Sequence, residues 1–102
     1  MKIKHNVTPK GLYIYFEGEL DEHHASSVRD KIDCLIDRYS STVSVVFNMR
    51  NLTFMDSTGI GVLIGRYKKL KNMKIPAYIE NPSFSADKVF SVSGIYKLIP
   101  KI

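Results

Sequence analysis

Two stretches of the chain carry apolar residues at helical spacing. In the first stretch these positions are Ala25, Val28, Ile32, Leu35, Ile36 and Tyr39, and in the second they are Ile60, Leu63, Ile64, Tyr67 and Leu70. Steps of three or four residues gather apolar side chains into one stripe on a helix. We therefore predict one amphipathic helix that begins after Asp21 and ends near residues 40–42, and a second from Ser57 to about Lys71.

Shorter runs rich in β-branched and aromatic residues lie around these helices. They cover residues 2–8, 12–16, 43–47, 74–79 and 95–99. The first two runs flank Pro9-Lys10-Gly11 and predict an opening hairpin. Residues 43–47 have the nearly continuous apolar character of a strand buried on both faces of a partly parallel sheet. A third helix is predicted from residues 81–83 to about Gly94.

The order of these elements is β-β-α-β-α-β-α-β, which predicts an α/β fold. Successive strand-helix-strand units imply parallel pairs joined by right-handed crossovers, hence a mixed, partly parallel sheet of four to five strands with about three helices. The 102 residues have room for one domain, covering residues 1–102. With 44% hydrophobic and 25% charged residues, the chain has an ordinary globular composition.

The sequence offers no apolar run of the roughly 18 residues that span a bilayer, and the first six residues lack the apolar core of a signal peptide. The single Cys34 cannot form an internal disulfide, which suits a reducing compartment. It falls opposite the apolar stripe of the first helix, where we expect an exposed thiol. We therefore expect a cytoplasmic protein with no membrane partner.

The formal net charge of +5 raises the possibility of nucleic-acid binding. The one dense basic cluster closes the second helix and consists of Arg66, Lys68, Lys69, Lys71 and Lys74. Cations are favourable there because they meet the carbonyl end of the helix dipole. Aromatic residues are not interleaved with these lysines as in a base-stacking surface. We expect a solvated helix end and no nucleic-acid partner.

Ser57 lies in the first turn of the second helix, beside backbone amides that lack intrahelical partners. A phosphate there would bring about −1.5 to −2 charge to the positive end of the helix dipole. Asp56 adds an acidic neighbour, and Gly59 and Gly61 would leave the approach open for a kinase or phosphatase. From position alone, a helix cap is the simpler interpretation of Ser57.

Three motifs resemble the STAS domain family. They are FMDSTGIGV at residues 54–62, GRYK at 65–68 and GELD at 18–21. Within that family they resemble the anti-sigma factor antagonists of spore-forming bacteria, in which the serine of Asp-Ser-[Ser/Thr]-Gly is phosphorylated. The element order matches a STAS domain across almost the whole chain. STAS domains usually finish with a further helix that is not present before Ile102, so no function of that helix is carried over.

This resemblance implies a binding protein, not an enzyme, that has no catalytic residues and needs no cofactor. The unphosphorylated form would bind an anti-sigma factor that is also a serine kinase, and would thereby free the sporulation sigma factor F. The kinase would use ATP to phosphorylate Ser57 and end the interaction, and a metal-dependent serine phosphatase would restore it. Thr58 is an alternative acceptor that the family pattern disfavours.

The helical wheel also predicts where the partner docks. If the apolar stripe of the second helix faces the sheet, the outward residues are Thr58, Gly61, Val62, Gly65 and Lys69. Together with Asp21, Asp56 and Gly59 they form the expected partner-binding surface. An exposed valine among glycines is unusual on a solvated helix. The alternative is that Gly61 and Gly65 permit close packing inside the domain.

Two other functions remain open. One is an antagonist for a general stress sigma factor. The other is a nucleotide-binding or hydrolysing enzyme, with Gly59, Gly61 and Gly65 as a phosphate loop and Glu80 as the ribose ligand. That fingerprint is weak because residues 48–56 separate the glycines from the expected strand, and no Gly-Lys-[Ser/Thr] is present.

Nucleophilic catalysis and metal binding have little support in the sequence. Ser57 is not in a Gly-x-Ser-x-Gly elbow, and nothing assigns His5, His23 or His24 as its base. The adjacent His23 and His24 would diverge by about 100° on a helix, so they cannot ligate one metal from one face. We expect solvated histidines at a helix start.

Overall fold

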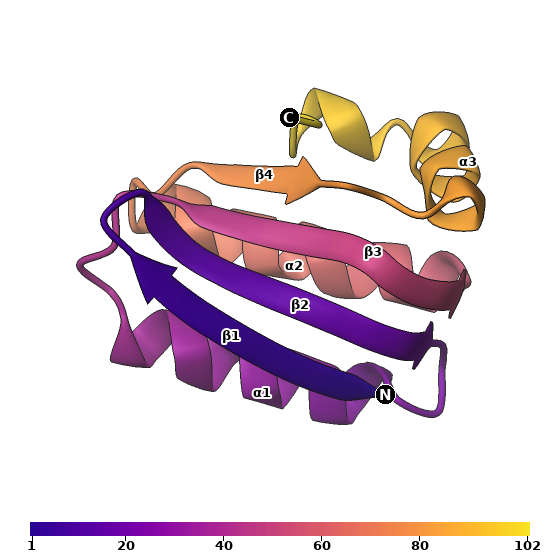
Figure 1. Cartoon of the computed structure of the whole chain (residues 1–102), viewed down its shortest axis with the longest axis horizontal. Helices are drawn as coiled ribbons and strands as arrows, with labels where there is room; N and C mark the ends of the chain where they lie inside the picture. Colours follow the sequence, from indigo (N-terminus) through magenta and orange to yellow (C-terminus); the bar gives the residue numbers. More distant parts are fainter.

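The computed structural model describes all of residues 1–102 and contains one four-stranded sheet (Figure 1). The strands are β1 (Lys2–Thr8), β2 (Gly11–Leu20), β3 (Val45–Met55) and β4 (Ala77–Glu80), in the order β1-β2-β3-β4. β1 and β2 form the predicted antiparallel hairpin, whereas β2, β3 and β4 run parallel to one another. The predicted mixed α/β sheet is confirmed.

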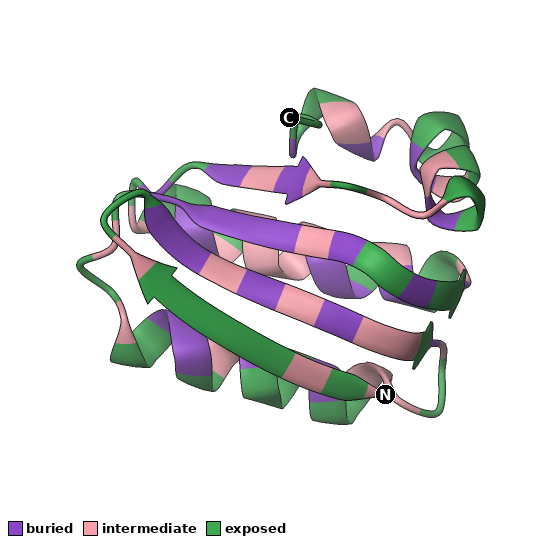
Figure 2. Cartoon of the chain, viewed as in Figure 1, coloured by how far each residue is buried: buried purple, intermediate pink, exposed green.

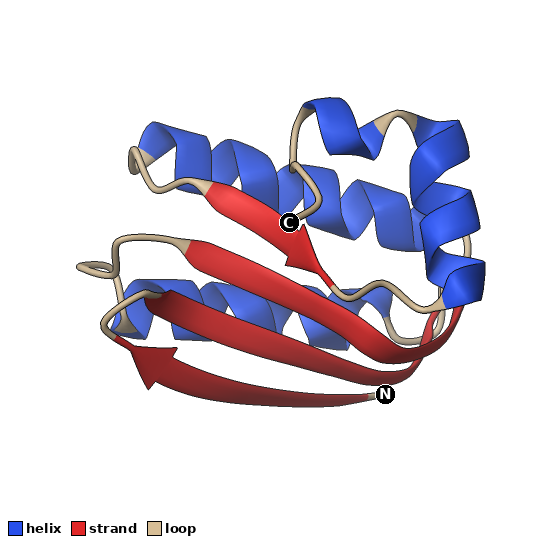
Figure 3. Cartoon of the chain, turned by 45° about the horizontal axis from the view of Figure 1, so that its top comes forward, coloured by secondary structure: helices blue, strands red, loops and turns tan.

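Two long helices, α1 (Ala25–Arg38) and α2 (Ser57–Asn72), cover one face of this sheet (Figure 3). A third helix, α3 (Phe84–Ser93), and a 3-10 turn, η1 (Ile95–Lys97), lie beside β4 (Figure 1). The start of α3 is capped by the Ser83 hydroxyl, which accepts from the Ala86 amide at 3.3 Å. Its end is at Gly94, whose φ of 77° lies in the left-handed region that favours glycine.

The core lies between the sheet and the α1–α2 layer. Alternate side chains of β2 and β3 point into it and are fully buried, among them Leu12, Ile14, Phe16, Phe47 and Met49 (Figure 2). The rings of Phe16 and Phe47 meet edge to face, with centroids 6.0 Å apart. The helices contribute their predicted stripes, with Ile32 and Leu63 at 0% exposure.

The predicted last strand at residues 95–99 is wrong. Ile95–Lys97 forms a 3-10 turn, and the Ile99 amide continues it by donating to the Ile95 carbonyl at 2.8 Å. Ile95 and Ile99 are both buried because a four-residue step returns both side chains to the same side of a turn. Extended pairing is limited to one parallel bridge between Lys101 and Ile79.

β3 is longer than predicted, running to Met55 instead of ending at Phe47. A register shift interrupts its pairing with β2: Tyr15 pairs with Asn48, but Glu17 pairs with Asn51. The extra residue is a β-bulge, which bends the strand and breaks the alternation. β2 likewise continues to Leu20, so the first three residues of the GELD segment form the end of this strand and Asp21 follows it.

Two further observations concern the surface. Cys34 is exposed on α1, as predicted. None of the helices combines the length and the apolar character needed to cross a bilayer.

Candidate functional site

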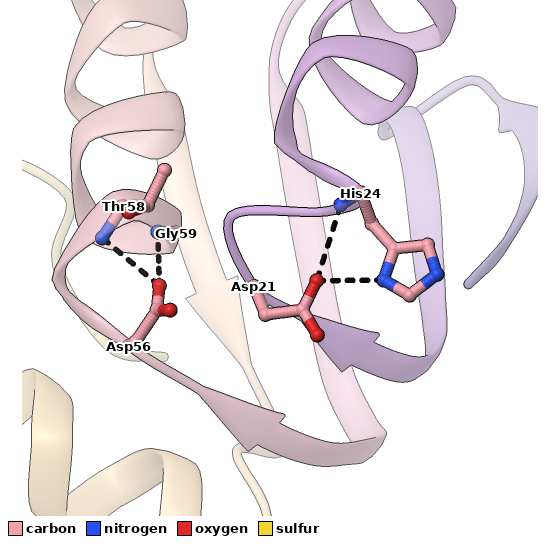
Figure 4. Close-up of polar contacts among 5 residues, drawn as sticks. All are labelled: Asp21, His24, Asp56, Thr58 and Gly59. Atoms are coloured by element: carbon pink, nitrogen blue, oxygen red, sulfur yellow. Dashed lines mark hydrogen bonds and ion pairs between the residues drawn. The ribbon is translucent and has the colours of Figure 1, made fainter.

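The candidate site lies where β2 and β3 end side by side. Leu20 and Met55 are paired residues at the carboxyl ends of these parallel strands, and Asp21 and Asp56 follow them. Each aspartate begins the turn that leads into a helix, Asp21 before α1 and Asp56 before α2 (Figure 4). In open α/β sheets, ligands usually bind outside the carboxyl ends of the strands.

Asp56 is the N-cap of α2. Its Oδ1 accepts hydrogen bonds from the amides of Thr58, at 3.0 Å, and Gly59, at 3.3 Å (Figure 4). Ser57 is therefore the first helical residue, and the interpretation of Ser57 as the cap is wrong. Its side chain is exposed at the positive end of the helix dipole. Two of the first-turn amides, those of Thr58 and Gly59, are held by the Asp56 side chain.

Asp21 holds the turn that precedes α1. Its Oδ1 accepts from the His24 amide at 3.1 Å and lies 2.7 Å from the His24 ring nitrogen Nδ1 (Figure 4). Partial desolvation works to raise the pKa of Asp21, but the hydrogen bonds from His24 and the nearby charges of His24 and His23 hold it below its ordinary value. The N-cap residue of α1 is His24, so the expectation that this helix begins directly after Asp21 is corrected: Asp21 accepts from the His24 amide in the turn before the helix.

A groove of about 470 Å³ runs between the starts of α1 and α2, and we call it the α1–α2 groove. Four predicted partner-binding residues line it together: Thr58, Gly61, Val62 and Gly65. A Cβ atom added to Gly61 or Gly65 would meet nothing within 4 Å. The alternative that these two glycines permit close internal packing is therefore wrong.

Val62 is buried, at 8% exposure, and belongs to the hydrophobic core, so its predicted exposure is wrong. The wheel assumed that α2 buries one stripe against the sheet. In the structure α2 also packs beside α1, which widens its buried sector to include Val62. Val62 thus lines the groove but exposes little of its side chain to a partner.

Gly59 is also buried, and it does not keep an approach open as expected. A Cβ atom added there would lie 2.6 Å from the Met55 Cγ and 2.8 Å from the Leu20 carbonyl oxygen. Glycine at this position lets the first turn of α2 approach the two strand ends closely.

Lys69 lies apart from the other predicted partner-binding residues. It is about 18 Å along α2 from Ser57 at 1.5 Å per residue. Its ammonium is 2.9 Å from the Asp37 carboxylate of α1, and the Arg66 Nε is 2.8 Å from the Asp33 carboxylate. The latter two atoms are close but not aligned as a hydrogen bond, so their contact is an ion pair. These pairs join α1 to α2.

A second groove, of about 500 Å³, lies on the other side of Ser57 and was not predicted. We call it the α2–α3 groove. It is lined by Met55, Asp56, Ser57, Ile60, Lys88, Val89, Val92 and Ser93. Val92 is 90% exposed. The buried side of α3 is defined by Ala86 and Phe90, and Val92 lies away from it. An apolar residue on the outer side of a helix was the one sign of this groove in the sequence.

The structure also bears on the nucleotide and catalytic alternatives. Because β3 extends to Met55, the glycines begin soon after the strand, but they lie inside α2 and not in the turn that a dinucleotide loop requires. The Glu80 carboxylate accepts from the side-chain Nδ2 of Asn48 at 2.8 Å. His5 contacts Tyr39, and no three His, Cys, Asp or Glu side chains are grouped as a metal site.

Comparisons with known proteins agree with these features. The family model described as STAS domain matches residues 1–102. The anti-sigma F factor antagonist of Lysinibacillus sphaericus is 37% identical over 90 residues, covering 87% of this chain and 75% of that protein. The anti-sigma-B factor antagonist of Bacillus subtilis (strain 168) is 26% identical over 88 residues, covering 86% of this chain and 78% of that protein.

Two solved structures of the anti-sigma factor antagonist SpoIIAA share this fold. The unphosphorylated form has a TM-score of 0.78 at 30% identity, over 99% of this chain and 88% of that one. The phosphorylated form, from Bacillus, has a TM-score of 0.72 at 30% identity, over 99% of this chain and 91% of that one.

Proposed function

The chain belongs to the STAS domain family, and from this membership we propose that it is an anti-sigma factor antagonist that acts by binding. The observation that carries the proposal is Ser57, an exposed serine at the first position of α2. Asp56 makes the capping contacts, so the Ser57 hydroxyl is not needed to start the helix.

Phosphorylation of Ser57 is the proposed switch. A phosphate would add about −1.5 to −2 charge at the positive end of the helix dipole. The dipole favours this charge, whereas the neighbouring Asp56 carboxylate opposes it. The helix would remain folded, and the new charge would face any protein docked on the first turn of α2.

In the proposed cycle, the unphosphorylated chain binds an anti-sigma factor with serine kinase activity and frees the sporulation sigma factor F. The kinase then transfers the γ-phosphate of ATP to the Ser57 hydroxyl, and the partner leaves. A serine phosphatase hydrolyses the phosphoserine and restores binding. The chain itself works in the cytoplasm and contributes no catalytic group.

Phosphopeptide mapping tests this cycle. Incubation with the anti-sigma F factor kinase and ATP should phosphorylate Ser57 stoichiometrically, and Ser57→Ala should block the reaction while still binding the kinase. Modification of Thr58 or Ser91 with Ser57 untouched would overturn the proposal.

The docking surface is proposed to include the α1–α2 groove beside the Asp21 turn. Gly65→Arg would fill this groove without an internal clash, because the space around Gly65 is open. We expect loss of partner binding with a change in the free energy of unfolding below about 1 kcal/mol. Asn72→Arg, at the far end of the same helix, is the matched control and should bind normally.

Val92→Arg tests the α2–α3 groove in the same way, because Val92 is exposed and lines that groove. If Val92→Arg abolishes binding and Gly65→Arg does not, the partner docks on the α3 side instead. Full binding by both variants would reject both faces.

A second candidate is an antagonist of the general stress sigma factor, which the similarity to an anti-sigma-B factor antagonist supports. Binding of the purified chain to an anti-sigma F factor and to an anti-sigma B factor, each with and without ATP, separates the two. The anti-sigma factor that binds the chain more tightly identifies the sigma factor that the chain regulates.

A further inference from the structure

One face of the sheet is not covered. α1 and α2 lie behind the sheet in Figure 1, while α3 and the C-terminal residues lie beyond β4, so no element crosses the face turned to the viewer. β2, β3 and β4 are parallel, and parallel strands are usually covered on both faces. The open face is therefore unusual for this type of sheet.

The strand register places the outward side chains in two rows across all four strands. The first row consists of Asn6, Tyr13, Val46 and Tyr78, and the second of Lys4, Tyr15, Asn48 and Glu80. Neighbours within each row are direct cross-strand partners. We call these eight residues the tyrosine face.

The centre of the tyrosine face is apolar. Val46 points outward but is only 3% exposed, because its direct neighbours Tyr13 and Tyr78 flank it. The tyrosine hydroxyls that hydrogen-bond within the chain are those of Tyr39 and Tyr96, so the hydroxyls of the tyrosine face have no protein partner. Large rings with free hydroxyls are typical of protein interfaces.

The charges of the tyrosine face lie at its opposite edges. Lys4 is on β1 and Glu80 is on β4, in the same row. Lys4 also contacts the neighbouring Glu17 at 3.2 Å. Because both signs are present, the face is poorly suited to the uniform negative charge of nucleic acid.

A two-fold axis parallel to the strands would make this face complementary to itself. It would place β1 of one copy over β4 of the other, so that each Lys4 faces a Glu80 and each Tyr15 faces an Asn48. A two-fold axis perpendicular to the strands, along the second row, would instead place Lys4 of one copy opposite Lys4 of the other. Only the first arrangement pairs opposite charges.

We propose that the tyrosine face binds a second copy of this chain, in a two-fold dimer with the two sheets face to face. Stacked sheets pack about 10 Å apart, with their strands within about 30° of each other. Four strands about 4.8 Å apart make the patch about 20 Å wide, and its two rows lie only about 7 Å apart along the strands. Its area is therefore on the order of a few hundred Å², below the roughly 800 Å² per partner of a standard interface. The dimer is weak and forms at high protein concentration.

Sedimentation velocity on the full chain, from about 10 µM to about 1 mM, tests the dimer. The wild type should shift from monomer towards dimer across this range. Lys4→Glu and Glu80→Lys should each weaken association by about tenfold or more. The double variant Lys4→Glu/Glu80→Lys should associate within about threefold of the wild type, because the charge pairs are restored in the opposite sense.

Lys68→Glu is the matched control, since it makes the same charge change on the exposed side of α2 and should not alter association. Circular dichroism and melting of each variant check that the fold is intact. The Tyr15→Ala variant should also weaken association, and it tests the face without altering any charge.

Three results would overturn the proposal. They are a wild type that stays monomeric at about 1 mM, a dimer that neither single charge variant nor Tyr15→Ala weakens, and single variants whose loss the double variant does not restore. None of these results bears on Ser57 or its kinase, so the dimer and the proposed function fail independently.

Discussion

Asp21 and Asp56 occupy equivalent positions in the two strand-to-helix turns, each one residue beyond the paired residues Leu20 and Met55. Asp56 caps α2 through two amides, whereas Asp21 holds the start of α1 through the backbone and ring of His24. Two negative charges therefore stand at the same edge of the sheet as Ser57. A partner that docks here meets an acidic edge, and phosphorylation would make it more acidic.

Asp56→Ala should destabilise the domain by about 1 kcal/mol, because the amides of Thr58 and Gly59 would lose their acceptor. Urea unfolding followed by circular dichroism measures the change. Asp56→Ser keeps a capping oxygen and should recover most of the loss. Equal stability of wild type and Asp56→Ala would mean that solvent satisfies these amides as well as the carboxylate does.

Ser57→Asp should change the free energy of unfolding by less than about 1 kcal/mol, because the added charge meets the favourable end of the helix dipole and Ser57 is exposed. Thermal and urea unfolding measure this. A loss of several kcal/mol would indicate that a charge at this position acts by unfolding α2, and the switch would then be conformational.

Gly59→Ala should destabilise the domain by about 1 to 3 kcal/mol, because its Cβ would overlap Met55 and the Leu20 carbonyl. Gly61→Ala is the control. It gains helix propensity in open space and should stabilise the domain by up to about 1 kcal/mol. The two variants should therefore move the urea midpoint in opposite directions, and a shared direction would contradict the packing described for Gly59.

Asp87 should contribute to acid sensitivity. The Tyr96 hydroxyl donates to it at 2.6 Å and the Lys101 ammonium at 3.1 Å, and these bonds hold the pKa of Asp87 below its ordinary value. A lowered pKa in the folded state means that the stabilisation is present above the unfolded-state pKa, about 3.9, and is lost as pH falls through the folded-state value.

Urea unfolding of wild type and Asp87→Asn between about pH 7 and about pH 2 measures this contribution. The stability gap between the two proteins should be constant at neutral pH and should shrink below about pH 4. Tyr96→Phe removes the hydroxyl that donates to Asp87. In the Tyr96→Phe background, Asp87→Asn should therefore cost less stability at neutral pH than it does in the wild type. A gap that does not change with pH would show that Asp87 acts only through packing.

The sequence was sufficient for the parts of the fold in which local pattern and tertiary packing agree. The β1–β2 hairpin, both long helices and the start of α3 lie where periodicity and turn residues predicted them. β3 was predicted too short because the bulge leaves two successive residues, Arg50 and Asn51, exposed. Alternation is the signal for a strand, and the bulge removes it.

The site was less predictable, because its shape depends on contacts between distant segments. Ser57 and Asp56 could be placed from the sequence, since capping is local. The burial of Val62 depends on the position of α1 beside α2, and the α2–α3 groove depends on where α3 docks. A helical wheel describes one helix alone, so it cannot show that α2 is buried by α1 as well as by the sheet.

Both edges of the sheet are unfavourable for adding further strands. Lys2 and Lys4 on the outer strand β1 would be forced together by another copy, and at β4 the backbone of Ile79 already bonds to Pro100 and Ile102. Chains at high concentration therefore cannot easily extend the sheet into a fibre. Association through the tyrosine face would stop at two copies, because a closed two-fold contact leaves no second such surface free.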